Sequence, residues 1–291
     1  MISSSRIRGW VAISLAALVP VSGAVGAGSA SPAALDAEAG ARPETGALAP
    51  NQQGMSAPIQ LPAPAVVGQV AYVQAAIQTT IDGGPVSLAL ATSASITSVG
   101  DDGSYTARST IDSVDVTNAP ASADVGAWGF TAVQGMSFDQ SYAATGTPID
   151  NATRSVDAQS LILDSVSMAY IGFPTTAVVV GESWNVDGTI GSDGLTFKVT
   201  YQCRLASVAD GSYTVNVSYA ENFSSPVESG VVDGTISGTG TLSGSLTNPL
   251  VVSGGLNQTI DGVRTVDGAA TPMRTDTSVT LTAIGGVSDG V

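Results

Sequence analysis

From about residue 66 onward, apolar and polar residues alternate along the chain with a period of two. The longest run covers residues 195–205, and shorter runs cover residues 212–219 and 273–282. Strict alternation is typical of a β-strand that buries one face and exposes the other to water. The sequence therefore predicts a β-stranded domain over residues 66–291.

Asp-Gly pairs punctuate these runs. This dipeptide tolerates the positive φ angles of tight hairpin turns, which favours an antiparallel sheet. We expect an all-β, mostly antiparallel fold, with one or two short helices at most. A duplicated curved sheet or half-barrel is the first architecture to expect, and a β-sandwich is the alternative. The four predicted turns lie at Asp102-Gly103, Asp193-Gly194, Asp210-Gly211 and Asp261-Gly262.

One segment has helical spacing. Ile162, Val166, Ala169 and Tyr170 recur at i, i+4, i+7 and i+8, and Phe173-Pro174 would end such a helix. The same run is compatible with a strand.

An internal repeat is visible in the domain. Residues 98–106 read SVGDDGSYT, and residues 207–214 read SVADGSYT. Each follows a predicted strand, turn and strand, which begin at Gly68 in the first case and Gly181 in the second. The pattern predicts two copies of one β unit, at about 66–155 and 175–291.

The N-terminal 65 residues differ from the domain. Residues 1–30 combine Arg6 and Arg8 with a short apolar run and small residues up to Ala30, as secretory signal peptides do. A retained membrane anchor is the alternative. Residues 31–65 are rich in Ala, Pro and Gly and predict a disordered spacer. We therefore expect a secreted or cell-envelope protein, located outside the cytoplasmic membrane.

Composition narrows the function. The formal net charge of −15 opposes binding to nucleic acid or to anionic lipid headgroups. The chain has no histidine, the commonest general base and metal ligand, and its one cysteine can form no intrachain disulfide. Cys203 alternates in phase with Phe197 and Tyr201, which predicts a buried, structural thiol. We expect no enzymatic activity, no catalytic residue and no cofactor.

The carboxylates form no convincing site. Asp112 and Asp115 are three residues apart, so on a regular strand they would face opposite ways. Asp187 and Asp193 bracket a predicted hairpin and could share a calcium ion, but the ligand order of an EF-hand is absent. We therefore expect no metal site.

Motifs in the second unit suggest a family. Phe173-Pro174 is followed by Val180-Gly181-Glu182-Ser183-Trp184 and by a Thr- and Val-rich strand pair that ends in an Asp-Gly turn. This order resembles uncharacterised secreted actinobacterial proteins, and in outline it resembles LolA- and LppX-like envelope carriers over residues 66–291. The resemblance implies a curved antiparallel sheet that cups a lipid acyl chain against helices. It assigns no functional residue.

These observations lead to one expected function and one alternative. The expected function is an exported, non-enzymatic envelope protein that binds an apolar ligand or lipid on its sheet. The candidate contacts are large side chains of the second unit, namely Trp184, Leu195, Phe197 and Tyr201. The alternative is a structural or adhesive cell-surface β protein without a small-molecule ligand.

The signal sequence gives the first testable prediction. Cleavage after Ala30 should give a mature chain that starts near Ser31, because small residues precede that position. N-terminal sequencing of exported material checks this, and recovery of Met1 would contradict it.

Overall fold

The structure, a computed structural model, describes residues 57–81, 84–120, 133–149, 172–192, 195–227 and 230–284. These residues form ten strands and no α-helix, so they contain no helix that is long and apolar enough to cross a membrane. The strands are β1 (Val70–Ile81), β2 (Gly84–Val99), β3 (Tyr105–Asn118), β4 (Ser137–Tyr142), β5 (Ser183–Ser192), β6 (Leu195–Ala209), β7 (Ser212–Val227), β8 (Gly230–Ser245), β9 (Val252–Val266) and β10 (Ala269–Ile284).

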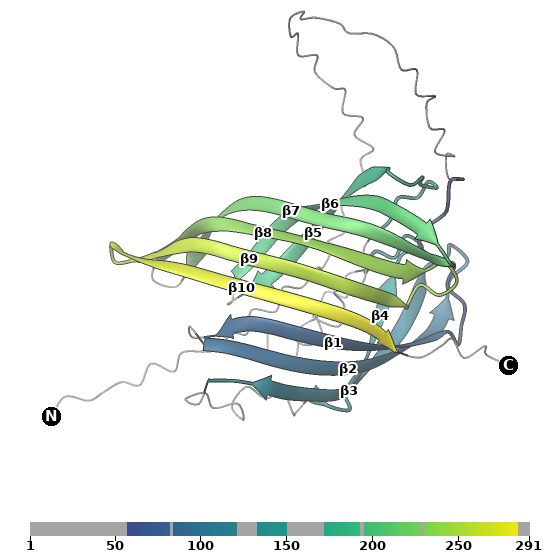
Figure 1. The fold of residues 1–291 in the computed structure, drawn as a ribbon, viewed down its shortest axis with the longest axis horizontal. Coiled ribbons are helices and arrows are strands. Elements are labelled where there is room, and N and C mark those ends of the chain that lie inside the picture. The colour runs from purple at the N-terminus through teal and green to yellow at the C-terminus, as the bar shows by residue number, and fades with distance from the viewer. Residues whose placement is uncertain are drawn as a thin grey trace, which may run out of the picture.

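All ten strands belong to one open antiparallel sheet, in the order β4-β3-β2-β1-β10-β9-β8-β7-β6-β5 (Figure 1). Hairpins build the two series β1–β4 and β5–β10, and pairing of β1 with β10 joins them. The prediction of an all-β, mostly antiparallel fold is confirmed. The predicted signal and the helix expected at residues 162–170 lie outside the described residues.

One face of the sheet is buried and apolar. Its main core cluster takes residues from both series, including Leu88 and Ile111 from one and Val215 and Ile236 from the other. Burying each such side chain contributes about 1.5–3 kcal/mol to stability. Residues 57–65, at the end of the predicted spacer, also contact this core, where Leu61 is 1% exposed. The opposite face carries Ser, Thr, Asn and Gln together with charged residues such as Arg108 and Asp139.

Two of the predicted Asp-Gly turns are found in the structure. Asp210-Gly211 has positive φ angles of 51° and 74° and connects β6 to β7, as expected. Gly103, with a φ of 80°, lies in the β2–β3 turn. Asp193-Gly194 lies outside the described residues.

The turn predicted at Asp261-Gly262 is wrong. Both residues lie inside β9, and Asp267-Gly268 forms the β9–β10 turn with φ angles of 50° and 80°. Asp261 pairs in register with Arg274 of β10, and their charged groups are 3.8 Å apart. Gly262 faces Gly234 of β8, where a Cβ would crowd the backbone of the neighbouring strand. A cross-strand ion pair and a close strand approach therefore explain this Asp-Gly pair.

The two predicted repeat units share local details. Gly68 has a φ of +88° and its N–H donates to Ile96 at 2.9 Å, whereas Gly181 has a φ of +95° and donates to Leu205 at 2.7 Å. A register shift follows both acceptors, at Ile96/Ser98 and at Leu205/Ser207. The duplication itself stays a prediction.

Glycines of β8 lie beneath aromatic rings of β7. Tyr213 pairs in register with Gly244, and Tyr219 pairs with Gly238. A Cβ added at either glycine would overlap the tyrosine ring opposite it. The glycines of this strand, which lacks the lysine of a phosphate-binding loop, thus make room for buried aromatic side chains.

This arrangement predicts the effect of a single methyl group. Gly244→Ala should lower the free energy of unfolding by about 1–3 kcal/mol, because the new Cβ overpacks the Tyr213 ring. Thr235→Ala, at an exposed position of β8, is the control and should stay within roughly 0.5 kcal/mol of the parent. Urea unfolding of both variants measures the difference, and equal stabilities would contradict the packing.

Candidate functional site

The four predicted ligand contacts lie on two neighbouring strands, β5 and β6. Trp184 is 8% exposed, and its indole N–H donates to the carbonyl of Gly172 at 2.9 Å. Tyr201 is 3% exposed and pairs with Val186 of β5. For the other two positions the structure describes the backbone, which places Leu195 opposite Ser192 and Phe197 opposite Ile190.

Tyr201 belongs to a group of polar residues on the apolar face. At the same level of the sheet, β7 contributes Tyr219 and β9 contributes Gln258, and Gly238 lies between them on β8. Thr277 of β10 pairs with Gln258, and its hydroxyl lies 2.9 Å from the hydroxyl of Thr79 on β1. We call this group the buried polar strip; its polar members are Tyr201, Tyr219, Gln258, Thr277 and Thr79, all 3–5% exposed.

Hydrogen bonding within the strip is incomplete. The Tyr219 hydroxyl donates to Oε1 of Gln258 at 2.5 Å. The Tyr201 ring packs edge-on against Tyr219, with centroids 5.1 Å apart. Within the described part of the chain, the Tyr201 hydroxyl and Nε2 of Gln258 have no hydrogen-bond partner although both are buried. An unpaired buried polar group costs about 1–3 kcal/mol, so a partner for these two groups would be stabilising.

Burial keeps the strip uncharged. It raises the pKa of Tyr201 well above its usual value, with further contributions from neighbouring Tyr219 and Cys203. Burial also raises the pKa of Tyr219. A phenol with the ordinary pKa of 10.0 is already protonated at neutral pH, and burial keeps both tyrosines protonated, as hydrogen-bond donors, further into the alkaline range.

Sequence reasoning identified Tyr201 but missed the remainder of the strip. The missing signal was a polar residue at an inward position of an alternating strand. Gln258 stands between Leu256 and Ile260 in that phase, and Thr277 precedes Val279 in the same way. Such residues require a buried hydrogen-bond partner, so they mark a candidate site.

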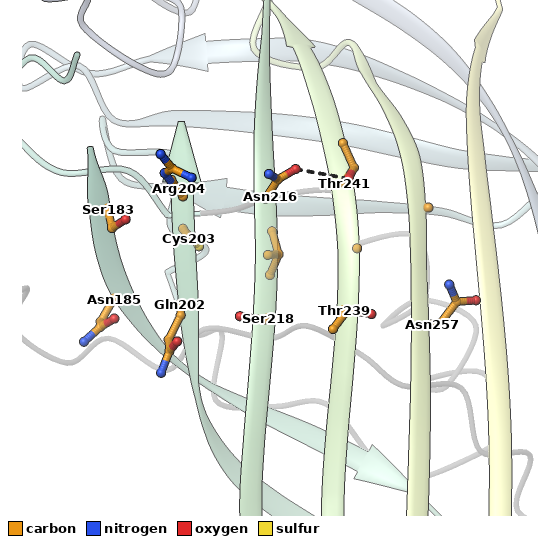
Figure 2. A pocket seen from close by; sticks show the side chains of 13 residues that line it. Ser183, Asn185, Gln202, Cys203, Arg204, Asn216, Ser218, Thr239, Thr241 and Asn257 are labelled. Carbon is orange, nitrogen blue, oxygen red and sulfur yellow. Dashed lines mark hydrogen bonds between the residues drawn. The ribbon is translucent and has the colours of Figure 1, made fainter. Parts of the chain in front are cut away.

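The opposite face carries an open groove across β5–β9. It encloses about 800 Å³, and a second hollow of about 430 Å³ adjoins it over shared residues of β6–β9. Figure 2 shows amide and hydroxyl side chains arranged across neighbouring strands. The larger groove, of about 800 Å³, is lined by Ser183, Asn185, Gln202, Cys203, Arg204, Asn216, Val217, Ser218, Thr239, Gly240, Thr241, Gly255 and Asn257.

One row of groove residues lies at a single level of the sheet. Successive register pairs join Asn185 to Gln202, Gln202 to Ser218, Ser218 to Thr239 and Thr239 to Asn257. We call these five residues the outer row. None of their side chains forms a hydrogen bond to another residue of the described segments. Their donors and acceptors face water.

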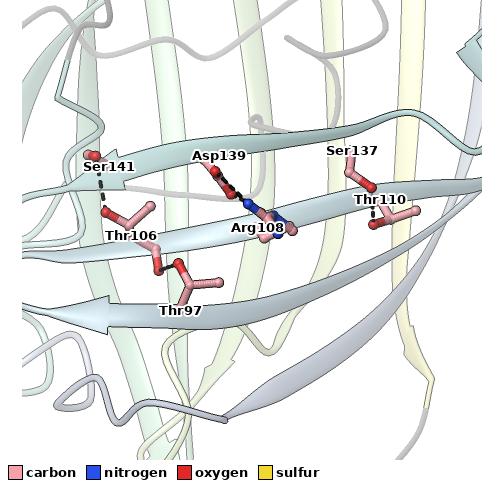
Figure 3. A network of polar contacts seen from close by, with 7 residues as sticks. All are labelled: Thr97, Thr106, Arg108, Thr110, Ser137, Asp139 and Ser141. Atoms are coloured by element: carbon pink, nitrogen blue, oxygen red, sulfur yellow. Dashed lines mark hydrogen bonds and ion pairs between the residues drawn. The ribbon is translucent and has the colours of Figure 1, made fainter.

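The same face is organised differently at the other end of the sheet. On β3 and β4, Thr110 bonds Ser137 at 2.8 Å, and Arg108 forms two bonds of 2.9 Å with Asp139 (Figure 3). The polar groups there bond one another across strands, whereas those of the outer row do not.

Carboxylates do not assemble a metal site in the described part of the chain, which holds no group of three or more potential ligands from His, Cys, Asp and Glu. Asp187 accepts a hydrogen bond from Thr200 at 3.0 Å. The expectation that Asp112 and Asp115 face opposite ways is wrong, since both are exposed. A β-bulge makes Asp112 an extra residue without a register partner on β2, which shifts the side-chain phase of β3, although Ser93 of β2 donates a hydrogen bond to the Asp112 carboxylate at 3.1 Å.

Comparison with protein-family models finds no match for this chain, and comparison with curated proteins finds none either.

Cys203 yields a prediction for alkaline pH. The thiol is 1% exposed, which confirms the predicted burial, and burial raises its pKa from 9.0 to about 12. The unfolded chain loses this proton near pH 9 while the folded chain keeps it, so stability is full below pH 9 and falls as the pH rises towards 12. The slope for one such group approaches about 1.4 kcal/mol per pH unit.

Cys203→Ala tests this assignment. The substitution should remove the decline that begins near pH 9, which precedes the main tyrosine contribution, whatever its effect on stability at neutral pH. Urea unfolding at several pH values measures both slopes. Parallel slopes in the parent and the variant would show that another group titrates.

Proposed function

We propose that this chain is an exported, non-enzymatic envelope protein that holds an apolar or lipid ligand against the buried face of its sheet. The observation that carries the proposal is a pair of buried donors, the Tyr201 hydroxyl and Nε2 of Gln258, for which the described residues offer no acceptor. They occur on a face that is otherwise mainly Val, Leu, Ile and aromatic residues.

The chemistry of the strip indicates which ligand it suits. Two donors require an acceptor oxygen, and the apolar residues around them suit a hydrocarbon chain. The described part of the strip contains no cation, and burying a carboxylate without one is costly. An uncharged oxygen, such as the carbonyl of an ester or amide, therefore fits better than a free fatty acid anion.

The non-enzymatic part of the proposal rests on the sequence. The chain has no histidine, and its single thiol is buried with a raised pKa, which leaves it a poor nucleophile. Export is supported by the predicted signal sequence.

Tyr201→Phe tests the proposal because it removes only the hydroxyl. If this group holds a ligand, the variant should retain much less co-purified lipid than the parent, as measured by native mass spectrometry of protein from its host. The ligand-free variant should be as stable as the parent or about 1 kcal/mol more stable, since it loses an unpaired buried hydroxyl.

Two further variants serve as controls. Tyr213→Phe changes a buried tyrosine outside the strip and should leave lipid retention unchanged. Tyr219→Phe breaks the bond to Gln258 and should destabilise the domain by about 1 kcal/mol or more. If the parent never carries a lipid and Tyr201→Phe only stabilises it, the binding function is wrong and a structural role replaces it.

A further inference from the structure

The outer row forms a repeating polar surface whose side chains form no hydrogen bonds to other described residues. Adjacent strands are about 4.8 Å apart, so five strands present one amide or hydroxyl group each over roughly 19 Å. Asn185, Gln202, Thr239 and Asn257 are exposed, and Ser218 is half-buried between them. The spacing follows from the strand register and needs no loop to maintain it.

The row continues beyond the groove. Asn257 pairs with Ser278 of β10, Ser278 with Gln78 of β1, and Gln78 with Ser87 of β2. Ser87 pairs with Asn118 of β3. Uncharged polar side chains thus occupy one level of the sheet from β5 to β3.

The groove lining is polar and carries a single charged residue, although the protein as a whole is strongly acidic. The chain carries a formal charge of −15, yet the groove lining contains no carboxylate, and Arg204 is its one charged residue. Arg204 donates from Nε to the carbonyl of Gly181 at the rim. None of the large exposed apolar residues of the described segments lines the groove. These features disfavour an anionic polymer and an apolar partner.

We propose that the outer groove binds an extended, uncharged glycan strand that runs across β5–β9. A primary amide offers a donor and an acceptor together, and a hydroxyl group does the same. The hydroxyl groups of a neutral sugar require this combination. The groove offers no exposed aromatic ring for stacking, so each contact is weak and binding depends on many sugar units meeting many strands at once.

This inference is independent of the proposed function, because the groove lies on the face opposite the buried polar strip. A glycan on the outer row would leave Tyr201 and Gln258 untouched. The two proposals can therefore fail separately.

Affinity electrophoresis tests the groove. The full mature chain is run on native gels that contain soluble neutral polysaccharides (a β-glucan, a mannan or a dextran) and on gels that contain dextran sulfate. At least one neutral polymer should retard the parent, and dextran sulfate should not. The double variant Gln202→Ala/Asn257→Ala should weaken retardation at least tenfold in apparent affinity.

A matched pair from the same face supplies the control. Thr110→Ala/Ser137→Ala removes two hydroxyl groups that bond each other on β3 and β4, away from the groove, and should leave retardation unchanged. Thermal unfolding verifies that each variant is folded.

Several results would overturn the proposal. These are no retardation of the parent by any neutral polymer, retardation only by dextran sulfate, and equal effects of the two double variants. Sedimentation showing that the groove residues instead join two copies of the chain would also overturn it. Tyr201→Phe should behave as the parent does on these gels.

Discussion

Each strand of this sheet must keep its apolar residues on one face, and a register slip of one residue would turn that face to water. The requirement applies to every hairpin and to the β1–β10 pairing. It fixes the core, since residues from both strand series enter one cluster. It also fixes which polar groups lie side by side on the opposite face. The register therefore sets stability and surface chemistry together.

The two candidate sites are products of this one register. Tyr201 precedes Gln202 on β6, Ser218 precedes Tyr219 on β7, and Asn257 precedes Gln258 on β9. Residues that neighbour each other along a strand point to opposite faces. The buried polar strip and the outer row therefore lie back to back at the same level of the sheet, and a shift in strand pairing would disturb both.

The sequence predicted the features that depend on alternation. It indicated the all-β class, the alternating phase that the structure describes over residues 198–205, and the burial of Cys203. It could not distinguish Asp261-Gly262 from Asp267-Gly268 as the turn, because that choice depends on the register of β9 with β10. It likewise missed the bulge at Asp112, since an extra residue leaves no signal in residue type.

The candidate site was harder to predict than the fold. Tyr201 was identified from its size and phase. The other polar residues of the buried polar strip lie on other strands, so their proximity to Tyr201 could not be seen in the sequence. Gln258 meets Tyr219 only because Gly238 leaves the space between them open, which is a property of three paired strands. The outer row likewise can be recognised only once four register pairs between strands are known.

The seam between β1 and β10 sets when this domain can fold. Thr79 and Thr277 meet there although they are 198 residues apart in sequence. Strand β1 has a partner on only one side until the last strand has been synthesised, so the two series cannot be united early. Contacts this distant in sequence make folding slow. The two halves of the sheet can therefore join only after β10 has been synthesised, whereas the hairpins within each series can pair earlier.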